Sequence, residues 1–245
     1  MTEARTATPD SPAAIRLVLF DIDGTLLWSD GAGRRAIHRA LIEIFGDTGP
    51  AEHRFDGKTD PQIVRELMRF VGHDDTHIDE HMDALFTRYV ACLREELKDP
   101  THHAAPLPGV MPLLDALVGR SDVTLGLLTG NLVDGARAKL EAVGIDPAIF
   151  VVGAFGTDHE LRPELPAIAQ QRARDLLGVD VPGSRIVIIG DTPADVECGR
   201  DIGARAIGVA SGRYSVDDLL AHGAAAVFED LCDTEAVMRA ILDEQ

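Results

Sequence analysis

Short apolar segments of strand length recur along the chain, and segments with helical periodicity lie between them. The apolar segments cover residues 16–20, 123–128, 149–153, 185–189, 205–209 and 225–228. They are largely apolar throughout instead of alternating with polar residues, which is typical of strands buried on both faces of a parallel sheet. The intervening helices are expected at 109–119, 133–142, 163–178, 193–201, 215–222 and 233–243. This alternation predicts an α/β fold with a doubly wound (Rossmann-like) parallel sheet, which binds ligands outside the carboxyl ends of its strands.

One long stretch interrupts this alternation. From about residue 30 to about residue 100 the pattern favours helices, at 32–45, 61–71 and 78–97, and offers no convincing strand. The Pro-rich segment 99–109 then has the composition of a hinge. We therefore expect an inserted α-helical cap domain over 30–104, a catalytic core over 15–29 and 105–245, and a loose N-terminal tail over 1–14.

Composition narrows the class of partner. The chain has 245 residues, with 23 Lys and Arg against 41 Asp and Glu, and a formal net charge of −18. A nucleic-acid backbone or an anionic membrane requires a basic face on its partner, so neither is expected. The three cysteines lie far apart and in no CxxC pair, which is typical of reduced thiols in a cytoplasmic protein. Whether the protein is a monomer or a homodimer stays open.

Polar residues follow the predicted strands at the points where those strands end. The four stretches are Asp21-Ile-Asp-Gly-Thr, Leu128-Thr-Gly-Asn, Glu160-Leu-Arg-Pro-Glu and Gly190-Asp-Thr-Pro-Ala-Asp. Because the carboxyl ends of parallel strands meet at one edge of a sheet, we expect all four around a single crevice. Carboxylates beside a hydrophobic interior repel one another and lose hydration, so something must offset that cost. Asp21, Asp23 and Asp191 form the kind of oxygen site that Mg²⁺ prefers, and the ion would also admit an anionic ligand.

Together and in this order, the DxDGT, TGN and GDTPADV motifs resemble those of the haloacid dehalogenase superfamily of phosphohydrolases, over nearly the whole chain. The helical insert resembles the cap of the branch that includes phosphoglycolate phosphatases. The resemblance implies that Asp21 attacks phosphorus and forms an aspartyl-phosphate, while Asp23 protonates the leaving oxygen and later activates water. It also implies that Thr129 donates to a phosphoryl oxygen, with the amides of Gly130 and Asn131 nearby.

The same resemblance implies a Mg²⁺ cofactor. Asp191 would ligate the ion together with Asp21 and the main-chain carbonyl of Asp23, and Asp195 would support it directly or through water. An acid in the first turn of a helix also favours the helix dipole without any metal, so that alternative stays open for Asp195.

Two basic residues, Arg162 and Lys58, are candidates for contacts with the substrate. Where many members of the superfamily have Lys-Pro in the third motif, this chain has Arg162-Pro, and Arg162 is favoured over Arg172 or Lys139 as the third-motif cation. Arginine keeps the charge and offers a fork suited to phosphate. In the insert, Lys58 follows a Gly-containing turn where the superfamily carries a specificity loop, so it is either a substrate-binding residue or a solvated turn residue.

The leading hypothesis is a Mg²⁺-dependent phosphatase acting on a small phosphorylated metabolite, phosphoglycolate-like or a sugar phosphate. A dehalogenase would lack Asp23. Phosphosugar mutases usually carry a histidine about a dozen residues after the nucleophile, where this chain has Gly33. A phosphonate hydrolase needs a cap lysine, a role open to Lys58. A non-enzymatic phospho-acceptor of the receiver type is the alternative from another class, but receivers have no helical insert. For Trp28, packing in the core is favoured over lining the crevice.

Overall fold

The structure is a computed structural model that describes residues 15–243, so the tail predicted over 1–14 lies outside the described residues. Six parallel strands form one sheet in the order β5-β4-β1-β6-β7-β8. The strands are β1 (Arg16–Phe20), β4 (Val123–Thr129), β5 (Val152–Phe155), β6 (Ile186–Gly190), β7 (Arg205–Val209) and β8 (Ala226–Phe228). The prediction of a doubly wound α/β fold is confirmed, and strand order reverses at β1.

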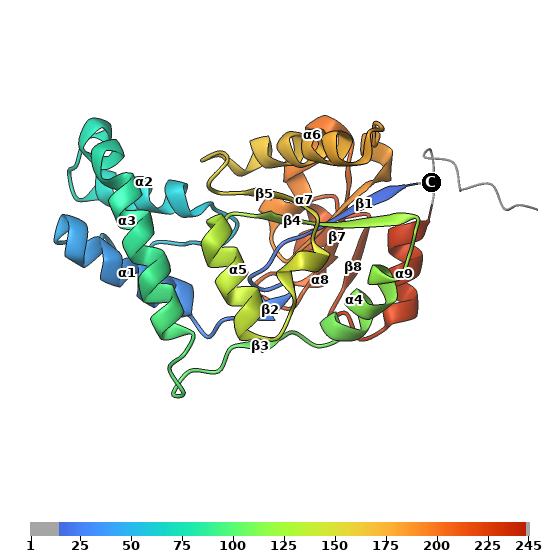
Figure 1. The fold of residues 1–245 in the computed structure, drawn as a ribbon, viewed down its shortest axis with the longest axis horizontal. Helices are drawn as coiled ribbons and strands as arrows, with labels where there is room; N and C mark the ends of the chain where they lie inside the picture. The colour runs from blue at the N-terminus through green and yellow to red at the C-terminus, as the bar shows by residue number, and fades with distance from the viewer. Residues whose placement is uncertain (1–14, 244–245) are drawn as a thin grey trace, which may run out of the picture.

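Helices cover both faces of this sheet, as Figure 1 shows with α6 on one side and α4 and α9 on the other. The core helices are α4 (Val110–Val118), α5 (Val133–Ala142), α6 (Leu165–Leu177), α7 (Pro193–Cys198), α8 (Val216–Ala221) and α9 (Thr234–Leu242). Leu17 and Leu19 of β1 pack in the layer that contains α6, whereas Val18 and Phe20 pack in the layer that contains α4, α5 and α9. Because β1 is apolar on both faces, its first carboxylate, Asp21, comes only where the strand ends.

The insert packs three helices around a hydrophobic cluster of its own. These are α1 (Ala32–Phe45), α2 (Asp60–Phe70) and α3 (Asp75–Glu96), which lie beside the core in Figure 1. The segments entering and leaving the insert pair as a two-stranded antiparallel sheet, β2 (Leu27–Trp28) with β3 (Ala105–Pro106). That small sheet was not predicted, because two residues are too few for a hydrophobic pattern. Residues 30–104 stay the proposed extent of the cap domain.

Some predicted boundaries are wrong for local reasons. The strand expected at 149–153 is found at Val152–Phe155, because Pro147–Ile149 form a 3₁₀ turn capped by the Asp146 side chain. The helix expected at 163–178 starts at Leu165, after another 3₁₀ turn, Arg162–Glu164. The helix expected at 193–201 ends at Cys198, and a 3₁₀ turn, Arg200–Ile202, follows it.

The first turn of α2 fixes the insert onto the core. The Asp60 amide donates to the Gly130 carbonyl at 2.8 Å, and the Asp60 carboxylate accepts from the Leu132 amide at 2.9 Å. The Thr59 hydroxyl donates to the Glu160 carbonyl at 2.5 Å. Asp60 is only 7% exposed, and its burial raises its pKa to about 6. The docked position of the insert therefore places a carboxylate where ionisation is disfavoured.

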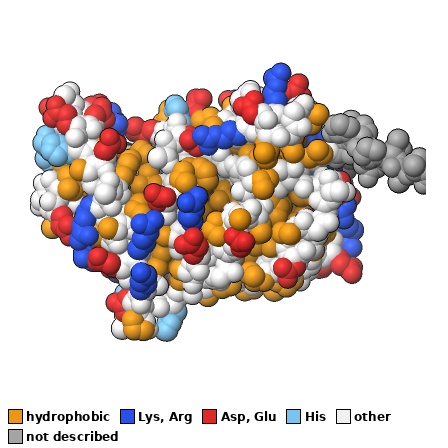
Figure 2. All heavy atoms as spheres, in the orientation of Figure 1, with side chains coloured by type: hydrophobic (Ala, Val, Ile, Leu, Met, Phe, Trp, Pro, Cys, Tyr) orange, Lys and Arg blue, Asp and Glu red, His pale blue; other side chains and the backbone are white. Residues whose placement is uncertain are grey.

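One face of the molecule carries charges of both signs (Figure 2). On the face that Figure 2 shows, Lys and Arg side chains are interspersed with Asp and Glu side chains and are not gathered into one patch. Within residues 15–243, no helix combines the length and the apolar character needed to cross a membrane.

Replacing Asp60 with asparagine tests whether burial of this carboxylate between the insert and the core lowers the stability of the protein. Asp60→Asn keeps an acceptor oxygen for the Leu132 amide but cannot ionise. The folded-state pKa is about 6 against an ordinary 3.8, so the wild type loses stability as pH rises through that interval, whereas the variant does not. Between pH 4 and pH 7, the free energy of unfolding should shift in favour of Asp60→Asn by up to about 3 kcal/mol. Urea denaturation at several pH values, with a chelator present, measures it. A difference that does not vary with pH would contradict this explanation.

Candidate active site

The loop after β1 carries Asp21 and Asp23 and turns sharply. The Asp21 amide donates to the Ile189 carbonyl of β6 at 2.9 Å, so Asp21 still belongs to the sheet. Gly24 follows with φ of 79°, and a Cβ on it would lie 2.3 Å from a carboxylate oxygen of Asp191. Glycine alone tolerates both the left-handed backbone and this approach. The loop can therefore lie directly against the end of β6.

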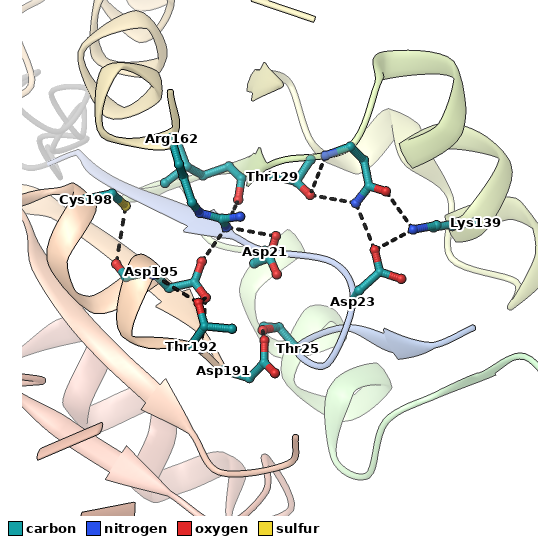
Figure 3. Close-up of polar contacts among 12 residues, drawn as sticks. Asp21, Asp23, Thr25, Thr129, Lys139, Arg162, Asp191, Thr192, Asp195 and Cys198 are labelled. Atoms are coloured by element: carbon teal, nitrogen blue, oxygen red, sulfur yellow. Dashed lines mark hydrogen bonds and ion pairs between the residues drawn. The ribbon is translucent and has the colours of Figure 1, made fainter. Parts of the chain in front are cut away.

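Arg162 lies between two carboxylates, as Figure 3 shows. Its Nη2 is 3.0 Å from an oxygen of Asp21, and it is also paired with Asp195. The same nitrogen donates to the Leu128 carbonyl at 3.3 Å, and the side chain is buried. Arg172, by contrast, pairs with Asp158 at 2.6 Å and stays largely exposed. Of the cations weighed for the third motif, Arg162 is the one beside Asp21.

Asp23 faces a different cation. From the last turn of α5, Lys139 Nζ donates to Asp23 Oδ2 at 2.5 Å and to Asn131 Oδ1 at 2.6 Å. Asn131 and Ser29 also donate to this carboxylate, at 2.9 and 3.1 Å. Enclosure in the cavity would by itself raise the pKa of Asp23, but Lys139, Asn131 and Ser29 together hold that pKa below its usual value. The two acids of the first motif therefore have opposite electrostatic surroundings.

Asp21 also lies close to two further carboxylates, those of Asp191 and Asp195. Oxygens of Asp21, Asp191 and Asp195 lie within 4.8 Å of one another. Burial raises the pKa of Asp21 to about 6 although Arg162 opposes it, and burial together with Asp195 and Asp21 raises the pKa of Asp191 well above its usual value. One buried arginine is thus too little positive charge for three carboxylates. This set of hard oxygen donors with uncompensated charge fits a divalent cation such as Mg²⁺.

The members of this cluster are not equally free to bind an ion. Asp195 Oδ2 accepts from the amide and hydroxyl of Thr192 in a capping box, and Oδ1 accepts from Arg162. Among the side chains of the described residues, the Thr25 hydroxyl donates to Asp191 over a long distance, 3.5 Å. The Asp23 carboxylate lies outside the cluster, so a ligand role for Asp23 rests on its main-chain carbonyl and stays a prediction.

The second motif lines the same cavity from the end of β4. The Thr129 hydroxyl accepts from the side chain of Asn131 at 2.8 Å, so these two residues brace each other. Gly130 is packed against the insert, since a Cβ on it would lie 2.1 Å from the Lys58 carbonyl. Their roles toward a ligand stay predictions, but the structure brings all three together with Asp21 and Asp23.

The insert closes one side of a cavity of about 550 Å³ above these residues. Lys58 lines it, and its amine is paired with Glu66 and lies 3.3 Å from His53 Nε2. Apolar side chains from the insert also line it, including Ile37, Phe55 and Ile63. Trp28 is 56% exposed and lines the cavity, so the expectation of core packing was wrong. Trp28 belongs to the short strand that leads into the insert, and at this position its side chain is not packed in either hydrophobic core.

Sequence reasoning missed several contributors to the site, including Lys139, Asp60, Tyr89 and Ser29. Lys139 was weighed only as a substitute for Arg162, and Asp60 and Tyr89 were not considered. Asp60 had a local signal, because an acid follows the threonine cap of α2. Tyr89 had none, since it is one of several large side chains on a long helix.

Comparison with known proteins agrees with this architecture. Residues 15–203 match the family model described as haloacid dehalogenase-like hydrolase. A protein named "Probable phosphatase IndB" from Dickeya dadantii is 28% identical over 231 residues, covering 92% of this chain and 94% of the relative. The phosphoglycolate phosphatase of Aquifex aeolicus is 24% identical over 194 residues, covering 78% and 83%.

A solved structure extends the comparison to the fold. The crystal structure of a hydrolase from Pseudomonas syringae superposes with a TM-score of 0.71 at 24% identity, covering 93% of this chain and all of the other. The family match spans β1, the whole insert and the strand ends that carry the four motifs. The chain therefore belongs to the haloacid dehalogenase-like hydrolases.

Proposed function

We propose that this protein is a phosphatase that hydrolyses monoesters of a small phosphorylated metabolite, phosphoglycolate-like or a sugar phosphate. The observation that carries the proposal is the pair of acids lining one cavity, Asp21 beside Arg162 and Asp23 beside Lys139. Such a pair can divide the work between a nucleophile and a proton donor. Two relatives of the chain are named phosphatases.

In the proposed reaction, a carboxylate oxygen of Asp21 attacks phosphorus, and the bond from phosphorus to the leaving oxygen breaks. Asp23 gives its proton to that oxygen, so a neutral alcohol leaves and Asp21 carries an aspartyl-phosphate. Asp23 then takes a proton from the water that attacks phosphorus, which releases phosphate and restores both acids. Thr129, with the amides of Gly130 and Asn131, is the proposed donor set for the phosphoryl oxygens.

The proposed cofactor is Mg²⁺. Asp21 and Asp191 would hold it with the main-chain carbonyl of Asp23. Asp195, whose oxygens are also bonded to Arg162 and Thr192, would support it directly or through water. When bound, such an ion supplies positive charge that lowers the repulsion between the carboxylates and a phosphate ester.

The cavity supports a substrate larger than the phosphoryl group. Its volume of about 550 Å³ lies within the range of small-molecule sites, and its walls combine apolar side chains with the amine of Lys58. A metabolite with a polar group remote from its phosphate could bind the Lys58 amine through that group and pack its carbon skeleton against the apolar side chains. We infer that Lys58 takes part in choosing that metabolite.

The alternatives have less support. Position 33 is a glycine, so the chain lacks the histidine that a mutase would use there, and a Cβ at this position would lie 3.3 Å from the Lys139 amine and crowd it. A phosphonate hydrolase would have to release Lys58 from Glu66 to form a Schiff base. The receiver-type alternative does not account for the helical insert.

The proposal also concerns surroundings and assembly. We propose a cytoplasmic enzyme, monomeric or homodimeric, with no nucleic-acid or membrane partner. Cys92, Cys198 and Cys232 are unpaired thiols, which accords with a reducing compartment.

Phosphate release from a panel of phosphate esters, with and without Mg²⁺, tests the proposed function. The wild type should release phosphate only with the metal, and Asp21→Asn should lower kcat on the order of 10³-fold or more, because the nucleophile is lost. Arg162→Met should lower kcat roughly 10²- to 10³-fold through lost charge stabilisation. Arg172→Ala, which changes an exposed arginine, is the control and should leave kcat unchanged. Metal-independent release, or full activity of Asp21→Asn, would sink the proposal.

Lys58 should influence the choice of substrate more than the chemistry. Lys58→Ala should lower kcat/KM for the preferred metabolite about 10- to 100-fold, which matches the loss of one charge-assisted hydrogen bond, and should leave a small aryl phosphate almost unaffected. Glu66→Gln is the matched control, because it frees the lysine without removing it. Steady-state kinetics on both esters measures the effect. Equal losses on all substrates would assign Lys58 to the shared machinery instead.

A further inference from the structure

Lys139 occupies an unusual position for a lysine. It is 3% exposed, and lysine is almost never fully buried unless it is paired. Its two short hydrogen bonds go to Asp23 and to Asn131, which itself donates to the same oxygen of Asp23. The three side chains form a closed triangle from the loop after β1, the segment after β4 and the last turn of α5. Figure 3 labels two of its members, Asp23 and Lys139. Such a triangle fixes the direction of the Asp23 carboxylate.

The two oxygens of Asp23 are bonded unequally. Oδ2 accepts from both the Lys139 ammonium and the Asn131 amide, so it has no room for a proton of its own. Among residues 15–243, Oδ1 accepts from the Ser29 hydroxyl alone, at 3.1 Å. Oδ1 is therefore the oxygen that can carry a proton to a leaving group in the cavity.

The insert encloses the same amine from its other side. A Cβ on Gly33, in the first turn of α1, would lie 3.3 Å from Lys139 Nζ and 3.7 Å from the Tyr89 hydroxyl. Tyr89, fully buried in α3, donates to Asp60, and the Asp60 carboxylate faces the charge of Lys139. Asp60 also accepts from the Leu132 amide just before α5. The insert thus encloses the Lys139 amine with its backbone at Gly33 and places the charge of Asp60 near it.

We propose that Lys139 is a positioning residue that aims Asp23 Oδ1 at the leaving oxygen, and that Asp60 and Tyr89 keep it in place only while the insert is docked. Proton donation would then depend on a correctly seated insert. This inference rests on the proposed function, because it assigns Lys139 to the proton-transfer step. It is separate from Arg162, which contacts Asp21 and not Asp23.

Leaving-group dependence tests the positioning role. An alkyl phosphate requires a proton on its leaving oxygen, whereas 4-nitrophenyl phosphate does not, and kcat/KM reports the steps up to loss of the leaving group. Lys139→Met, which keeps the length of the side chain, should lower kcat/KM for the alkyl ester about 10²-fold or more, the scale of general acid catalysis. The nitrophenyl ester should lose far less. Lys98→Met, at an exposed position in the turn just beyond the last helix of the insert, is the matched control and should change neither.

A second variant tests the role of the insert and does not depend on how well Lys139→Met folds. Tyr89→Phe removes only a hydroxyl, and it should produce the same selective loss on the alkyl ester, several-fold in size. Equal losses on both esters in these variants, with an active wild type, would overturn the positioning role alone. Absence of phosphate release by the wild type from either ester would overturn the proposed function, and this inference with it.

Discussion

Asp21 and Asp23 follow the same buried strand, and two carboxylates so close to each other and to a hydrophobic interior repel one another and lose hydration. Each of them therefore needs its own compensating partners. Residues 17–20 of β1 are apolar, so the two carboxylates come only after the strand ends. Arg162 reaches Asp21 from the turn before α6, and Lys139 reaches Asp23 from α5, so each acid has its own cation. The pKa of Asp21 is raised and that of Asp23 is lowered, because burial dominates at the first and hydrogen-bonded partners dominate at the second. The two chemically identical groups therefore have opposite electrostatic surroundings.

Close approach between elements makes this arrangement possible. Gly24 lets the loop after β1 lie against Asp191, and Gly130 lets the segment around Lys58 lie against the second motif. A Cβ at position 24 would collide with the Asp191 carboxylate, and a Cβ at position 130 would collide with the Lys58 carbonyl of the insert. The insert is therefore part of the site and not only a cover, since its residues Asp60 and Tyr89 complete the surroundings of Lys139.

The sequence predicted what depends on local pattern. The continuously apolar strands predicted the sheet, and the ends of those strands predicted that Asp21, Asp191 and Arg162 would meet, because parallel topology brings such ends together. It could not predict the partner of Asp23, since Lys139 lies eight residues beyond Asn131 on a helix whose rotation is set by packing. Trp28 was misjudged for a related reason: a large apolar residue predicts burial, but this one lies on a two-residue strand beside a cavity. The pairing of β2 with β3 depends on the path of the whole insert, and no short segment encodes it.

The most direct test of the division of labour is a search for the phosphorylated residue itself. Asp23→Asn should still be phosphorylated by 4-nitrophenyl phosphate, whose leaving group needs no proton, but should lack the base that removes the phosphoryl group. Acid quenching followed by peptide mass spectrometry should then find a phosphoryl adduct on Asp21, and none when Asp21→Asn is added to the same variant. An adduct on another residue, or sustained phosphate release by Asp23→Asn with no adduct on Asp21, would contradict the roles assigned to the two acids.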